Sequence, residues 1–123
     1  MPHLILTGCS EIPDARDAFP RQAHRWRRAV MKTEGVWMRT DRDALLVEGV
    51  VIEFSRALHP LAIVAGHHDD VTIRLWDHQT IERTDGVQRW LAIVARTVLD
   101  ACGGRLKSTN ITVDLWQDLE LPR

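Results

Sequence analysis

The residue with the most distinctive chemical potential is Pro2, which follows the initiator methionine and precedes a short apolar segment. If Met1 is removed after synthesis, Pro2 carries a free secondary amine. A terminal amine has a pKa of about 8 in model peptides, and apolar surroundings or nearby arginines lower that pKa towards neutrality. Such an amine can take a proton from one atom of a substrate and return it to another. The alternative is structural, because proline is also tolerated as the first residue of a strand.

The segment Gly66–Asp70, with the sequence GHHDD, contains two histidines and two aspartates, and these residue types can bind zinc or another divalent ion. Adjacent residues point in different directions on a strand, however, so they cannot easily surround one ion. The sequence offers no H-x-x-x-H or C-x-x-C pair to complete a ligand set. We therefore interpret this segment as a polar turn between two strands, and no metal site is predicted.

The overall charge indicates neither a nucleic-acid nor a membrane partner. Sixteen basic and seventeen acidic residues give a net charge of −1, whereas nucleic-acid-binding domains are typically basic. No apolar run approaches the roughly 20 residues that a membrane-spanning helix requires. Five basic residues share one side of the first predicted helix and are interpreted as a solvated face: Arg21, Arg25, Arg27, Arg28 and Lys32.

The cellular compartment is predicted from the start of the sequence and from its cysteines. The first residues lack the charged, apolar and small-residue regions of a signal peptide, so we expect a cytoplasmic protein. Cys9 and Cys102 are too few for a disulfide framework and form no C-x-x-C motif. We expect both to be reduced and mostly buried.

One domain spanning residues 1–123 is predicted, because no linker or low-complexity segment divides the chain. The clearest element is an amphipathic helix from Asp85 to Cys102, in which apolar residues recur at intervals of three and four. An earlier helix is predicted from Asp14 to Lys32, which either kinks at Pro20 or has its regular part beginning near that residue. Strands are predicted over Leu4–Thr7, Val36–Thr40, Ala44–Phe54, Leu61–Ala65, Val71–Trp76 and Thr109–Leu119.

The arrangement of these elements predicts an α/β fold. The segments VTIRLW and ITVDLW are near-copies that flank the second helix, and strand, helix and strand in this order predict a crossover between parallel strands. The first half of the chain offers the same order. We therefore predict two βαβ units sharing one sheet, with both helices on one face. Oligomerisation would cover the other face, because an uncovered apolar sheet face is an association site.

Met-Pro-His followed by an apolar strand and two predicted βαβ units resembles the tautomerase superfamily, most closely the 5-carboxymethyl-2-hydroxymuconate isomerase family. The similarity is greatest in MPHLILTGCSEI and in SRALHPLAIVAGHHDDVTIRLWDHQTIERT, whereas residues 33–51 form an insertion. The resemblance implies a homotrimer that uses no cofactor. It also implies a keto–enol tautomerase that isomerises a small unsaturated 2-hydroxy or 2-oxo carboxylic acid.

The resemblance assigns roles to particular residues. Pro2 would be the general base and acid, and Arg56 lies where the family binds the substrate carboxylate. Arg39 is an alternative displaced by the insertion. Arg74 could also bind the substrate, and Trp116 could form an apolar wall. The simpler interpretations are solvated arginines, pairing of Arg74 with Asp114, and packing of Trp116. The alternative function is a non-catalytic protein of the same trimeric fold that binds a small molecule or a partner.

Overall fold

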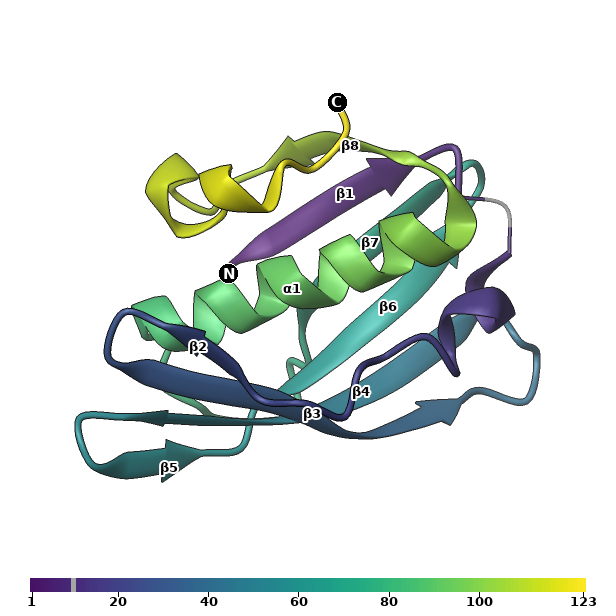
Figure 1. Cartoon of the computed structure of the whole chain (residues 1–123). Helices are drawn as coiled ribbons and strands as arrows, with labels where there is room; N and C mark the ends of the chain where they lie inside the picture. The colour runs from purple at the N-terminus through teal and green to yellow at the C-terminus, as the bar shows by residue number, and fades with distance from the viewer. Residues whose placement is uncertain (10) are drawn as a thin grey trace.

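The computed structural model describes residues 1–9 and 11–123, which form an antiparallel sheet curled around a long helix (Figure 1). The strands are β1 His3–Thr7, β2 His24–Trp26, β3 Ala29–Met38, β4 Ala44–Glu53, β5 Arg56–Leu58, β6 Leu61–His67, β7 Asp70–Leu75 and β8 Arg105–Thr109. The helix α1 is Asp85–Cys102, and three 3₁₀ turns are η1 Ile12–Ala15, η2 Val113–Leu115 and η3 Gln117–Leu119.

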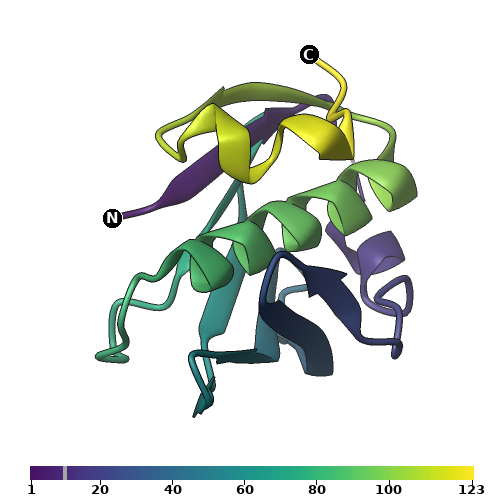
Figure 2. The same ribbon diagram turned by 60° about the vertical axis from the view of Figure 1, so that its left-hand side comes forward.

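The order of strands across the sheet is β2-β3-β4-β6-β7-β1-β8, and β5 pairs separately with β4. Every paired neighbour is antiparallel. The first strand, β1, therefore lies inside the sheet between β7 and β8. Helix α1 lies across the concave face, and the C-terminal turns pack beside it (Figure 2).

The sequence of α1 explains both its limits and its position. The Thr84 side chain accepts a hydrogen bond from the backbone N–H of Val87 at 3.1 Å, which caps the first turn. Gly103 ends the helix in the left-handed conformation, with φ at 76°. In the middle of the helix, the buried indole of Trp90 lies directly over Gly49 of β4. The centre of the concave face is thus filled by protein side chains.

The predicted first helix, from Asp14 to Lys32, is wrong. Its regular part is instead the antiparallel hairpin of β2 and β3, joined by the two residues Arg27 and Arg28. The apolar residues of this segment satisfied a helical spacing, but residues 30–37 are also rich in β-branched and aromatic side chains, which favour strands. From Val30 to Met38, β3 pairs with β4, and this pairing selects a strand over a helix.

The predicted last strand, Thr109–Leu119, is also wrong. The strand that pairs with β1 is β8, and the chain turns at its end. The hydroxyl of Thr109 donates to the backbone oxygen of His3 and accepts from the backbone N–H of Ile111. The following residues form η2 and η3. The near-copies VTIRLW and ITVDLW therefore adopt different structures, because the place beside β1 is already taken by β8.

These two differences correct the fold class. The protein does not contain two βαβ units with two helices on one sheet face, because the described residues contain one α-helix and an antiparallel sheet. One feature of the expected crossover remains: β7 and β8, which flank α1 in sequence, both run antiparallel to β1 and so are parallel to each other. The structure thus differs from the tautomerase arrangement that the resemblance implied.

The buried side chain of Arg89 connects the C-terminal turns to α1 through hydrogen bonds. The side chain of Arg89 is 1 % exposed and contacts both carboxylate oxygens of Asp118, at 2.5 and 3.0 Å. It also donates to the backbone oxygen of Leu115 at 3.1 Å and contacts Nε2 of His24 at 3.1 Å. These bonds join three parts of the chain, namely α1, β2 and the segment after β8. Burial and the positive charge of Arg89 both lower the pKa of His24.

Candidate functional site

Pro2 is buried at the start of β1, and its nitrogen is a peptide amide while Met1 is present. The backbone oxygen of Met1 accepts a hydrogen bond from the side-chain amide of Asn110 at 2.8 Å, and Nδ1 of His3 lies 3.1 Å from the same oxygen. A cavity of about 220 Å³ begins at Met1 and is also lined by Trp76. Removal of Met1 would therefore free the secondary amine of Pro2 next to this cavity.

The four other predicted site residues have contacts of their own: Arg74 lies 3.6 Å from Asp77, whereas Asp114 pairs with Arg27. Arg74 is paired with His3 across the sheet, but Pro2 lies on the buried face and Arg74 on the convex face, since side chains alternate along a strand. Arg56 is on β5, where both its terminal nitrogens bond the carboxylate of Glu82 at 2.9 and 2.8 Å.

Arg39 and Trp116 occupy two further parts of the molecule. Arg39 follows β3, at the opposite end of that strand from the β5 hairpin, and pairs with Asp41 at 2.8 Å. Trp116 is buried, and its indole donates a hydrogen bond to the backbone oxygen of Ile111 at 3.0 Å. Arg39 and Arg56 therefore lie towards opposite ends of the β3–β4 pair, and each already pairs with an acidic side chain.

The GHHDD segment forms the hairpin turn between β6 and β7, as the sequence predicted. His68 occupies this two-residue turn with a positive φ of 56°, and the rings of His67 and His68 lie edge to face. Within residues 1–9 and 11–123, no group of three or more histidine, cysteine or acidic side chains is arranged to hold a metal ion.

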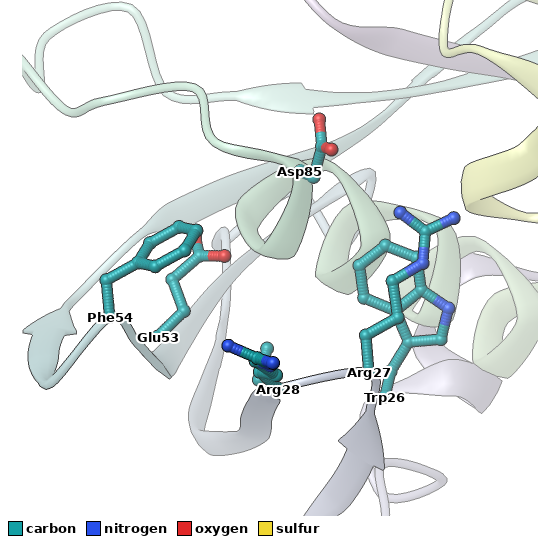
Figure 3. A pocket seen from close by; sticks show the side chains of 7 residues that line it. Trp26, Arg27, Arg28, Glu53, Phe54 and Asp85 are labelled. Carbon is teal, nitrogen blue, oxygen red and sulfur yellow. The ribbon is translucent and has the colours of Figure 1, made fainter.

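A different cavity has the clearest polar chemistry. It has a volume of about 290 Å³ and lies where the β2–β3 turn, the β4–β5 turn and the start of α1 meet (Figure 3). This volume is close to the lower limit for small-molecule pockets. The residues that line it are Trp26, Arg27, Arg28, Ala29, Glu53, Phe54 and Asp85.

Glu53 is the central residue of this cavity. It is the last residue of β4, and its side chain faces the concave side with only 7 % of the residue exposed. Its carboxylate packs against Gly86 in the first turn of α1, where an added Cβ would lie 2.9 Å from the carboxylate atoms. The positive end of a helix dipole favours a negative charge at this place. Glycine at position 86 thus makes room for the carboxylate.

One oxygen of the Glu53 carboxylate receives no hydrogen bond from the described part of the protein. Its atom Oε1 is buried and has no hydrogen-bond partner among the residues that the structure describes. A buried acceptor without a donor costs about 1–3 kcal/mol, and more if it is charged. Because the side chain also lines an open cavity, a donor from a bound molecule would remove this cost.

Two arginines supply positive charge to the same cavity. Arg27 and Arg28 form the β2–β3 turn. The guanidinium of Arg27 stacks on the ring of Trp26 at 4.2 Å and approaches Asp114 at 3.4 Å, with about half of its side chain exposed. Arg28 forms none of the ion pairs found among the described residues. Its charge is available to an anionic ligand.

The remaining wall is Phe54, which is 77 % exposed at the rim of the cavity. Phe54 and Ser55 form the β4–β5 turn, and both have positive φ values, 52° and 60°. Such turns strongly prefer glycine or asparagine. A bulky residue held in this conformation is unusual, and strained positions of this kind gather at binding sites.

The sequence-based interpretation missed this site, although one signal was present. Glu53 continues an inward-facing alternation that includes Val47 and Val51, so a charged residue stands where an apolar one is expected. Arg27 and Arg28 were interpreted as the solvated face of a helix and instead form a hairpin turn. These arginines come near Glu53 only because residues 24–38 form a β-hairpin and not a helix.

Comparisons with known proteins add no family to this geometry. No protein-family model, curated protein or solved structure matches the chain. Among the described helices, none has the length and apolar character that crossing a membrane requires.

Proposed function

We propose that this protein binds a small organic molecule in the cavity formed by Glu53, Arg27, Arg28 and Phe54. The observation that carries the proposal is the buried, unpartnered Oε1 of Glu53 at the wall of an open cavity. The ligand would carry an N–H or O–H donor for Glu53 and an anionic group for Arg28. Phe54 would cover an apolar part of it.

The size and charge of the cavity limit the ligand. A volume of about 290 Å³ admits a molecule of about one aromatic ring with short substituents. The lining combines two arginines with two acidic residues, Glu53 and Asp85. A zwitterionic ligand therefore complements the site better than a simple cation or a simple anion.

Three related probes test this proposal: para-aminomethylbenzoate, benzylamine and benzoate, titrated separately and followed by heteronuclear NMR. We expect the first to bind most tightly and to shift the resonances of Trp26, Phe54 and Gly86. Glu53→Gln should weaken binding of the two amines about tenfold or more, because a charge-assisted hydrogen bond is lost. Arg28→Gln should weaken the two carboxylates instead. Asp69→Asn, in the exposed β6–β7 turn, is the matched control.

The stability of Glu53→Gln separates a ligand-binding role from a structural one. If Oε1 is unpartnered in the free protein, the cost of burying it offsets the favourable helix dipole, so Glu53→Gln should change the free energy of unfolding little. A structural carboxylate that stabilises the start of α1 would instead make the variant less stable. Loss of stability, together with unchanged probe shifts, would overturn the proposal.

A Pro2-dependent isomerase is the second candidate, and the cavity of about 220 Å³ beside Met1 favours it. In this candidate, Met1 is removed and the amine of Pro2 moves a proton within an enol acid. Arg83, which lines that cavity, would bind the carboxylate. The test follows ketonisation of phenylenolpyruvate by protein whose intact mass lacks Met1. Turnover that Pro2→Ala abolishes would support the candidate, and a rate equal to that of buffer would reject it.

A further inference from the structure

The convex face of the sheet carries a cross-strand row of side chains that turn away from α1. Trp37 pairs with Leu46, Leu46 with Ile63, and Ile63 with Arg74, so that one row crosses β3, β4, β6 and β7. Trp37 is 53 % exposed, and the other three side chains are partly exposed. In the described residues, no helix lies over this face (Figures 1 and 2).

A second row of outward-facing side chains lies two residues further along the same strands. Glu48 on β4 pairs with Leu61 on β6, and the backbone N–H of Trp76 bonds the oxygen of Leu61 at 2.8 Å. Trp37, Leu46, Ile63 and Trp76 together line a groove of about 280 Å³ on this face. Two tryptophans and two aliphatic residues are thus at least partly exposed around one groove, and such patches mark association sites.

We propose that this convex face forms a two-fold symmetric homodimer. The two-fold axis would run parallel to the strands and pass between β4 and β6. Rotation about this axis keeps each residue at the same position along the strand direction. It places β3 of one copy opposite β7 of the other, and β4 opposite β6. Leu46 then faces the partner's Ile63, and Trp37 faces the partner's Arg74. The row is self-complementary, because an aromatic ring stands at one end and a guanidinium at the other, and these two groups attract each other.

Charge complementarity supports a second copy as the occupant. The same symmetry places Arg74 of one copy diagonally opposite Glu48 of the other, because Glu48 is one strand and one row away from the position of Trp37. Facing sheets lie about 10 Å apart, a gap that a glutamate and an arginine can bridge together. Within one copy, Glu48 forms none of the ion pairs found among the described residues, and the partner of Arg74 is Asp77, at 3.6 Å.

The proposal also explains why the face is not more polar. A sheet with one solvated face usually alternates apolar with polar residues, but here the outward positions of β4 and β6 include Leu46, Val50, Leu61 and Ile63. Because the sheet is curled, we expect an interface of modest size, whose occupancy depends on protein concentration.

Sedimentation velocity over a range of concentrations tests the proposal. We expect the wild-type chain of 14.1 kDa to approach twice that mass as concentration rises. Arg74→Glu and Glu48→Arg should each raise the dissociation constant by about tenfold or more, because each places like charges together. The double variant Glu48→Arg/Arg74→Glu should restore dimerisation. Circular dichroism spectra of all variants would show whether the fold is retained.

Val113→Ser is the matched control, because Val113 is also an exposed apolar residue, at 48 %, but lies on η2, which is not part of the sheet. It should leave the dissociation constant unchanged. A monomer at every concentration would overturn the proposal, and so would a trimer. A dimer that neither charge reversal weakens would place the interface elsewhere and overturn it as well.

Discussion

Arg89→Ala is expected to lower the free energy of unfolding by about 3 kcal/mol, because it removes a buried group that is paired on several sides. The side chain of Arg89 is 1 % exposed and bonds both the carboxylate of Asp118 and the backbone oxygen of Leu115. Its loss leaves that oxygen without this donor and opens a cavity under the C-terminal turns. Urea denaturation followed by tryptophan fluorescence would measure the change.

Arg89→Met separates the volume of the side chain from its charge. Methionine fills most of the space but forms none of the bonds, and the remaining carboxylate of Asp118, which is 64 % exposed, can be solvated by water. We expect a loss smaller than that of Arg89→Ala. If both variants unfolded within about 0.5 kcal/mol of the wild type, the cluster would have no stabilising role.

The effect of Arg89→Ala should also depend on pH. Hydrogen bonding to Arg89 lowers the pKa of Asp118 below its usual value of 3.8. The stability that this pairing contributes is present above pH 3.8 and is lost as pH falls through the lowered pKa of the folded state. The difference between wild type and Arg89→Ala should therefore narrow in acid, and an equal difference at every pH would contradict this account.

Gly49→Ala is expected to cost about 2 kcal/mol, because a methyl group at this position would overlap the indole of Trp90. Trp90 is 1 % exposed and cannot move away without disturbing the core. Gly35→Ala is the matched control, since the indole above Gly35 belongs to Trp37, which is 53 % exposed and free to turn. We expect Gly35→Ala to cost less in the same denaturation experiment.

A double-mutant cycle checks the physical cause. Trp90→Phe removes part of the ring that the new methyl group would meet, so Gly49→Ala should be better tolerated in that background. We expect a coupling free energy of about 1 kcal/mol or more between the two sites. Strict additivity would mean that Gly49 is required for its backbone conformation rather than for the space above it.

The parts of the fold that the sequence predicted correctly are those in which local signals agree. The period of α1 and the glycine that ends it allowed only one interpretation. The strands β1, β6 and β7 were bounded by glycines or polar turns. Thr84 and Asp85 are both good N-cap residues, and the hydrogen bond from Val87 shows that the N-cap is Thr84.

The errors arise where partners distant in sequence decide the structure. Residues 24–38 carry apolar side chains that suit both a helix and a strand, and pairing with β4 selects the strand. Residues 111–116 resemble β7 almost residue for residue, but they reach the sheet after β8 has taken the free edge of β1. The cavity at Glu53 was not predicted because it requires the β2–β3 hairpin to be recognised first.

The position of β1 inside the sheet also affects how the chain folds. This strand is made early on the ribosome, yet both of its partners, β7 and β8, come from the second half of the sequence. Contacts between such distant segments slow folding, because the entropy of closing long loops is lost before the pairing compensates for it. The meander β3-β4-β6-β7 is local and can form first. We expect β1 to dock late, after α1 has packed against β3, β4 and β7.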